Sequence, residues 1–172
     1  MAFSNNGTMA PWGAPVKVFR TLANSITVTI NDSVKTASGF AALGTTGALV
    51  LGHVQGIGTA KGMPVSSTGV AGADFGSFIN TFLTASDNQT VAQVKAEIDV
   101  SKFTLYSAEV DATIGTTTGS NLAGYTQDLV DEDTLDESTA ATTTGQYMGH
   151  GVDPYNTAQA IVNIFESQVF GV

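Results

Sequence analysis

Two kinds of residue in this chain could carry chemistry: a dense acidic run and two histidines. The acidic run, "DLVDEDTLDES" at residues 128–138, holds six of the chain's 15 acidic residues. They are Asp128, Asp131, Glu132, Asp133, Asp136 and Glu137. Carboxylates gathered in this way could bind Ca²⁺, or could pair for acid–base catalysis of glycoside hydrolysis.

The acidic run does not fit either kind of site. Paired catalytic carboxylates need a defined separation and one raised pKa, and a flexible, crowded loop is not expected to hold them so. A calcium loop counted from Asp131 would need oxygen ligands at its first, third and fifth positions, glycine at its sixth and glutamate at its twelfth. The fifth, sixth and twelfth positions are Leu135, Asp136 and Thr142. The Thr- and Gly-rich stretches 115–127 and 137–146 flank the run, so we interpret it as a solvated loop pinned to the core by its apolar residues, without a metal.

The histidines, His53 and His150, each follow a glycine in "LGHVQG" and "MGHGVD". A zinc site needs further ligands, usually at closer spacing, and the chain has no Cys to supply them. A G-x-S-x-G nucleophile motif is absent from the sequence. "GIGTAKG" (56–62) departs from both common phosphate-loop patterns, so it is read as a turn. These patterns predict two structural histidines, no cofactor and no enzymatic activity.

Composition limits the partners that the protein can have. The formal net charge is −9, only 12% of the residues are charged, and the six Lys and Arg residues form no cluster in the sequence. Because phosphate binding needs clustered basic residues, neither a nucleic acid nor an anionic membrane is an expected partner. The first residues have no basic and apolar leader pattern, so we expect no secretory signal.

The elements that would position these residues are mostly strands. Alternation predicts strands at 25–32, 92–100 and 106–114, the last two joined as an antiparallel hairpin by a tight turn at Ser101-Lys102. A buried strand is predicted at 47–58. A helix from 91–98 fits less well than a strand, and "DFGSFINTFL" (74–83) has the spacing of an amphipathic helix. The segment 153–170 fits either type, and we favour a turn after Pro154 followed by a strand.

The predicted fold is therefore mainly β, an antiparallel barrel-like or sandwich-like fold with one or two short helices and an extended N-terminal arm. The arm comprises residues 1–15, and residues 16–172 form a β-rich domain or two small lobes, about 16–85 and 86–172. The arm lacks periodicity, and its Pro11, Trp12 and Pro15 are the candidate partner-binding residues, since Trp is a frequent interface anchor.

The residues "AGYTQDLVDEDTLDESTAATTTGQYMGHGVDPYNTAQAIVNIFESQ" (123–168) resemble the end of bacteriophage head decoration, or capsid cement, proteins. The matching features are the Gly151–Pro154 corner and the strand Ile161 to Phe165, and "ALVLGHVQGI" (48–57) is similar to the early strands of that group. The resemblance implies a structural virion protein, commonly a homotrimer, on the outer surface of an assembled capsid. Its partner would be the lattice of the major capsid protein. A tail or fibre component and a carbohydrate-binding β-module are the alternatives.

Overall fold

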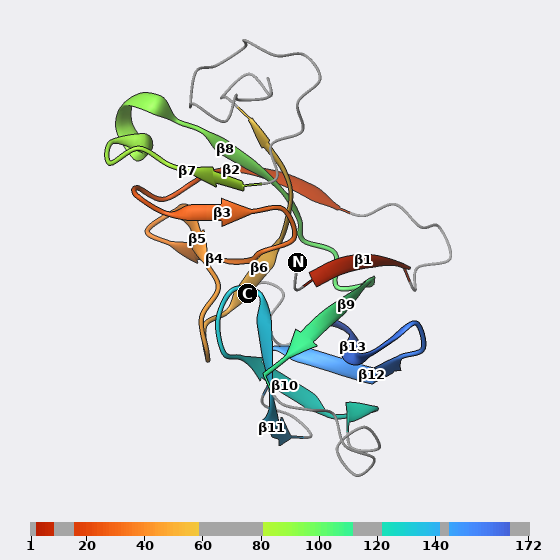
Figure 1. The fold of residues 1–172 in the computed structure, drawn as a ribbon. Helices are drawn as coiled ribbons and strands as arrows, with labels where there is room; N and C mark the ends of the chain where they lie inside the picture. The colour runs from red at the N-terminus through yellow and green to blue at the C-terminus, as the bar shows by residue number, and fades with distance from the viewer. Residues whose placement is uncertain (1–2, 9–15, 59–80, 112–121, 142–144, 166–172) are drawn as a thin grey trace.

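The structure is a computed structural model that describes residues 3–8, 16–58, 81–111, 122–141 and 145–165. It is mainly β, as predicted. The described strands form two barrel-like bodies that stack along the long direction of the molecule (Figure 1).

The first barrel is a five-stranded antiparallel sheet in the order β2-β8-β6-β4-β5. Its strands are β2 (Lys17–Thr21), β4 (Ser33–Ala37), β5 (Phe40–Leu43), β6 (Val50–Gly58) and β8 (Lys95–Asp99). A parallel bridge between Leu22 and Ala41, with the Ala23 N–H donating to the Ala41 carbonyl at 2.8 Å, draws the two edges of the sheet together. The sheet therefore curls around its own apolar face.

A two-stranded ribbon, β3 (Thr27–Thr29) with β7 (Thr81–Leu83), supplies further core residues to the first barrel. Val28 and Phe82 are register partners on this ribbon, and both side chains are buried. The core of the first barrel comprises Leu22, Val28, Val34, Ala41, Val54, Phe82, Val94, Ala96, Ile98 and Val100.

The second barrel is closed. Its strands are β9 (Thr104–Val110), β10 (Thr126–Leu129), β11 (Thr134–Ala141), β12 (Tyr147–Asp153) and β13 (Asn156–Ile164). The pairings run β9-β11-β10-β12-β13, and β13 pairs back to β9, which completes the ring. Side chains that face its interior form a second apolar core, to which Val50 of β6 also belongs.

The segment predicted as an N-terminal arm is tied to this second barrel. Residues 3–8 are extended, but they form strand β1 (Phe3–Thr8), which pairs with β9. The Phe3 side chain is fully buried in the core of the second barrel. Residues 3–8 are therefore docked on the second barrel. Pro11, Trp12 and Pro15 lie outside the described residues.

The predicted hairpin over 92–114 is wrong, although both of its strands exist. β8 pairs with β2 and β6 in the first barrel, whereas β9 pairs with β1, β11 and β13 in the second. The chain crosses between the barrels at residues 100–103. The Asp99 carboxylate accepts hydrogen bonds from the Ser101 N–H at 2.9 Å and the Thr104 hydroxyl at 2.7 Å, which makes this crossing a corner rather than a hairpin turn.

The other observed elements agree in part with those predicted from the sequence. Strand β6 matches the prediction at 47–58, and β3 lies within 25–32. β13 begins two residues after Pro154, as favoured for that segment. Of the helix predicted at 74–83, residues 81–83 are strand β7, and 74–80 lie outside the described residues. A short π-helical turn, η1 (Asn88–Ala92), lies between β7 and β8.

Candidate functional site

A buried polar network lies where the two barrels meet. It joins His53 of β6, Ser33 of β4 and Asp99 of β8 from the first barrel with Tyr106 of β9 and Tyr147 of β12 from the second. All five side chains are 0% exposed. His53 is the register partner of both Ser33 and Asp99, so the sheet itself places these three residues side by side.

A glycine beside His53 permits this close arrangement. A Cβ atom at Gly52 would lie 2.1 Å from the Asp99 carbonyl oxygen, which is far inside contact distance. Only glycine therefore lets β6 and β8 approach each other here, which explains why "LGHV" places Gly directly before the histidine.

The hydrogen bonds of His53 fix its tautomer. Its Nδ1 lies 3.0 Å from the Asn31 carbonyl oxygen, which can only accept, so Nδ1 carries the proton. Nε2 then accepts from the Tyr147 hydroxyl at 3.0 Å, and the Tyr147 hydroxyl oxygen also lies 2.9 Å from Ser33 Oγ. Both ring nitrogens of His53 therefore have partners.

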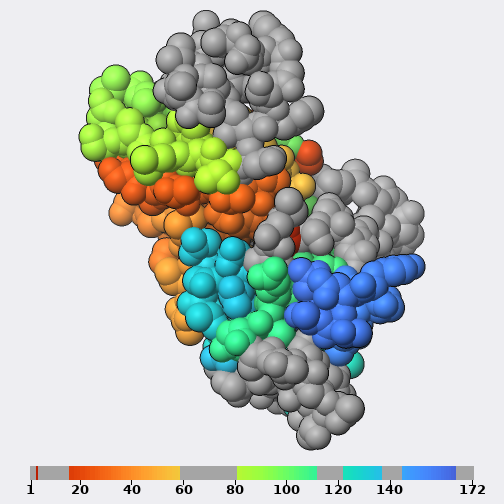
Figure 2. Space-filling view, viewed as in Figure 1, coloured from red at the N-terminus to blue at the C-terminus, as the bar shows by residue number. Residues whose placement is uncertain are grey.

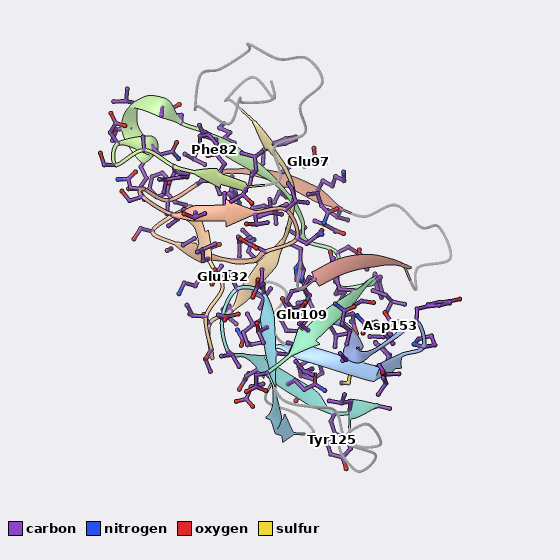
Figure 3. All side chains as sticks on the ribbon, viewed as in Figure 1. Phe82, Glu97, Glu109, Tyr125, Glu132 and Asp153 are labelled. Carbon is purple, nitrogen blue, oxygen red and sulfur yellow. The ribbon has the colours of Figure 1, made fainter. Side chains whose placement is uncertain are left out.

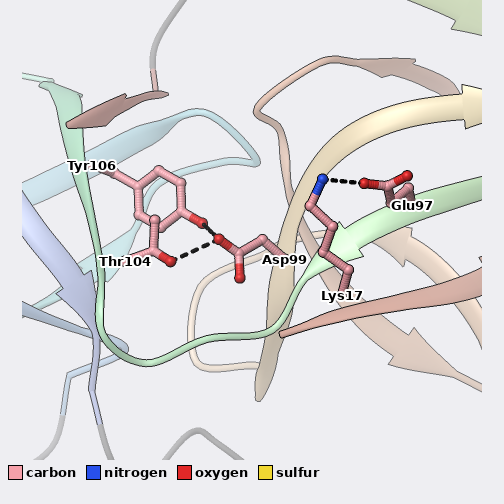
Figure 4. Close-up of polar contacts among 5 residues, drawn as sticks. All are labelled: Lys17, Glu97, Asp99, Thr104 and Tyr106. Carbon is pink, nitrogen blue, oxygen red and sulfur yellow. Dashed lines mark hydrogen bonds and ion pairs between the residues drawn. The ribbon is translucent and has the colours of Figure 1, made fainter. Parts of the chain in front are cut away.

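Asp99 is held in the same interface by three donors. Its Oδ2 accepts from the Thr104 hydroxyl at 2.7 Å and the Tyr106 hydroxyl at 3.0 Å, while Oδ1 accepts from the Ser101 N–H. Figure 4 shows the two hydroxyls converging on the Asp99 carboxylate, with the Lys17–Glu97 ion pair nearby on the first barrel. A buried carboxylate that is hydrogen-bonded in this way avoids much of its desolvation cost.

Burial sets the charge states of this network. It lowers the pKa of His53 to about 4, so the imidazole is neutral at pH 7. It also raises the pKa values of Tyr106 and Tyr147 above their ordinary value, so both phenols keep their protons. The His53 ring packs against the rings of Tyr106 and Phe3, with centroids 4.0 and 4.5 Å away.

These residue types occur in catalytic sites, but here the side chains are sealed from solvent and bonded to one another. The arrangement can hold the two barrels together, and it offers no exposed group to a substrate. His53 therefore packs and forms hydrogen bonds within the junction, and the expectation that it does no chemistry stays a prediction. His150 is exposed on β12 instead, with its Nε2 2.6 Å from Asn163 Oδ1.

A second junction between the barrels is made by Gln146, whose side chain is 1% exposed. Its Nε2 donates to the carbonyls of Thr45 and Ala48, at 3.0 and 2.6 Å, in the loop before β6. Its Oε1 accepts from the N–H groups of Leu129 at 2.8 Å and Gly47 at 3.3 Å. All four bonding positions of the amide are used, and three of the partners belong to the opposite barrel.

The acidic run forms an ordered β-hairpin, which corrects its interpretation as a loop. Asp128 lies on β10 and Asp136 is its register partner on β11, with a turn at residues 130–133 between the strands. Leu129 and Leu135 are fully buried and anchor the hairpin, as expected, whereas Val130 is 45% exposed. Among the residues that the structure describes, no three His, Asp or Glu side chains are grouped to hold a metal ion.

The turn of this acidic hairpin contacts the first barrel beside a buried carboxyl group. The Ser33 N–H donates to the Glu132 carbonyl at 2.7 Å, and Figure 3 shows Glu132 at the junction of the barrels. The neighbouring Asp32 is 5% exposed. Burial, and then the charges of Glu132, Asp133 and Asp131, raise the pKa of Asp32 to about 7, against the opposing effect of the Thr29 N–H.

The sequence did not identify the residues that join the barrels. Tyr106 and Tyr147 are fully buried, so neither can present the exposed aromatic face that a carbohydrate-binding module needs. Tyr125 is 36% exposed and Tyr155 is 95% exposed. The position of Tyr155 directly after Pro154 in a predicted turn is the sequence signal for its exposure.

Comparison with known protein families, with curated proteins and with solved structures finds no match for this chain. Within the part of the chain that the structure describes, no helix has the length and apolar character needed to cross a membrane.

Proposed function

We propose that this protein is a structural component of a phage particle, a decoration protein that binds the outer surface of an assembled capsid and stabilises it. The observation that carries the proposal is the junction between the barrels. His53, Asp99 and Ser33 are residue types that occur together in catalytic sites, and all three are fully buried there.

A protein that stabilises a shell must transmit force between its contacts without deforming. Two barrels tied by aromatic packing, the His53 network and the Gln146 amide suit that role, because interiors packed in this way resist deformation. The acidic, sparsely charged surface favours a partner bound through apolar and backbone contacts. The proposed partner is the lattice of the major capsid protein, bound by a homotrimer.

The candidate contact residues Pro11, Trp12 and Pro15 lie in the sequence between β1 and β2, the outer strands of the two sheets. Removing residues 1–15 would also remove Phe3 from the core, so a truncated chain is a poor test of this segment. Trp12→Ala leaves β1 in place and is the suitable variant.

The test is co-sedimentation of the full chain with empty heads of the phage that encodes it. These heads are assembled in the absence of this protein. We expect saturable binding to assembled heads, much weaker binding to free capsid subunits, and a loss of affinity in Trp12→Ala. Sedimentation equilibrium of the free protein measures whether it is a trimer. A full-length, folded chain that does not bind the heads would refute the proposal and favour the fibre or sugar-binding alternatives.

A further inference from the structure

One aromatic side chain projects from the second barrel without packing against it. Pro154 and Tyr155 form the two-residue turn of the β12–β13 hairpin, and the Tyr155 side chain is 95% exposed. The next most exposed large apolar residue among those described is Val91, at 72%. Figure 2 shows this hairpin, in dark blue, reaching out from the side of the second barrel.

The turn that carries Tyr155 is held in one conformation. Asp153, which is 5% exposed, accepts the Tyr155 N–H through Oδ1 at 2.8 Å, and its Oδ2 accepts the hydroxyl proton of Ser107 on β9. The Ser107 hydroxyl and the Tyr155 N–H hold the pKa of Asp153 below its ordinary value, so these bonds persist at neutral pH. Because the tip is fixed before binding, little conformational entropy is lost when it docks.

The exposed residues of the tip are uncharged, although the protein carries a net charge of −9, and the carboxylate beside them, Asp153, is already buried. The sequence 154–165 contains no Asp, Glu, Lys or Arg. The exposed neighbours of Tyr155 are short and uncharged, namely Pro154, Asn156, Thr157 and Ala158. The tip can therefore be desolvated without burying a charge, which is the main cost of placing a protein surface in an apolar pocket.

We propose that this tip is a docking knob whose anchor is Tyr155, and that it inserts into an apolar pocket on the capsid protein with an acceptor for the phenol hydroxyl at its rim. This inference rests on the proposed function and names the contact that serves it. A convex tip with a single aromatic ring requires a concave partner, whereas sugar-binding sites are themselves concave. Tyr is also among the residues most enriched at binding hot spots.

The experiment compares the binding of four proteins to empty heads by co-sedimentation: the parent chain, Tyr155→Ala, Tyr155→Phe and the control Val91→Ala. Val91 is an exposed apolar residue of the first barrel. We expect Tyr155→Ala to weaken binding roughly 30-fold or more, as loss of a hot spot does, with an unchanged melting temperature. Tyr155→Phe should keep most of the affinity, and Val91→Ala should keep all of it.

A second measurement on the parent protein is hydroxyl-radical footprinting read by mass spectrometry. Tyr155 should be oxidised readily in the free protein and protected on the heads, while the oxidation of Val91 should not change. If the parent chain binds and Tyr155→Ala binds equally well, or if Tyr155 stays unprotected, the knob is refuted and the proposed function stands. If the parent chain does not bind the heads, the proposed function fails first. Binding to an immobilised glycan that Tyr155→Ala abolishes would overturn the protein-pocket inference.

Discussion

Two buried glutamines of the second barrel, Gln146 and Gln127, differ in how far their side-chain amides are hydrogen-bonded. Gln146 fills all four hydrogen-bonding positions of its amide and joins the second barrel to the loop before β6. Gln127, on β10, is 0% exposed, yet neither its Oε1 nor its Nε2 has a hydrogen-bond partner within the described structure. A buried amide without partners is costly, so the two side chains should contribute to stability with opposite signs.

The matched changes Gln146→Leu and Gln127→Leu test this difference. Gln146→Leu leaves two carbonyls and two N–H groups without their partner, and we expect a loss of about 2–4 kcal/mol of unfolding free energy. Gln127→Leu removes two unpaired polar atoms, and we expect a gain of about 1–2 kcal/mol. Urea denaturation at pH 7 measures both. A destabilised Gln127→Leu would show that its amide has a partner, such as an internal water.

Asp32 should make the protein less stable as the pH rises. Its pKa is raised from 3.8 to about 7 on folding, so the folded state binds more protons than the unfolded state between these values. The unfolding free energy that Asp32 contributes therefore falls as the pH rises through this window. His53 acts in the opposite sense between about pH 4 and 6.5, because its pKa is lowered on folding.

The variant Asp32→Asn isolates this contribution, because the other titrating groups cancel in its difference from the parent chain. Asn can still accept the Thr29 N–H and carries no charge. The variant's advantage in unfolding free energy should be small near pH 4, grow up to about pH 7 and level off at about 1–3 kcal/mol. Denaturation curves at pH 4, 5, 6, 7 and 8 measure the trend. A difference that is the same at every pH would contradict the raised pKa.

At the scale of elements, β1 is the strand whose role differs most from expectation. The segment before β2 has no apolar periodicity, but β1 is held by its pairing with β9 and by one buried side chain, Phe3. The Phe3 ring lies 4.5 Å from the His53 ring and 5.3 Å from the Tyr147 ring, between centroids, so β1 contacts both sides of the junction. A single buried residue such as Phe3 cannot be recognised from hydrophobic periodicity, because periodicity is visible only where apolar residues recur.

Phe3→Ala should therefore destabilise the whole protein by about 3–5 kcal/mol, as truncation of a buried aromatic side chain does. Phe19→Ala is the matched control on β2, another outer strand, because the Phe19 side chain is 55% exposed. We expect the control to change the unfolding free energy by less than about 1 kcal/mol. Equal stability of the two variants would mean that β1 does not dock in solution.

The sequence predicted which segments are strands better than it predicted how they pair. Alternation located β8 and β9 because burial of one face leaves a local pattern. It could not show that they belong to different barrels, because that depends on the corner at Asp99 and on partners far away in the sequence. The buried junction was missed for the same reason, since Ser33, Asp99 and Tyr147 come from three distant strands.

Two buried junctions that share no residue join the barrels. One is the His53 network with its surrounding rings, and the other is the Gln146 amide with the loop before β6. A further bond between the barrels runs from the Ser33 N–H to the Glu132 carbonyl. Each barrel also has an apolar core cluster. A core is one requirement for a domain that folds independently. Whether they unfold together depends on these junctions, because breaking either one exposes buried polar groups.

We expect the parent protein to unfold in one thermal transition, with equal calorimetric and van't Hoff enthalpies. The double variant Gln146→Leu, Tyr147→Phe removes one tie from each junction, and it should unfold in two transitions or show a van't Hoff enthalpy well below the calorimetric value. Val162→Ala is the control, because Val162 is buried in the second barrel's core. It should lower the melting temperature and keep a single transition. Two transitions in the parent protein would show that the barrels unfold independently. The proposed function would then lose the support that it takes from rigid coupling between the barrels.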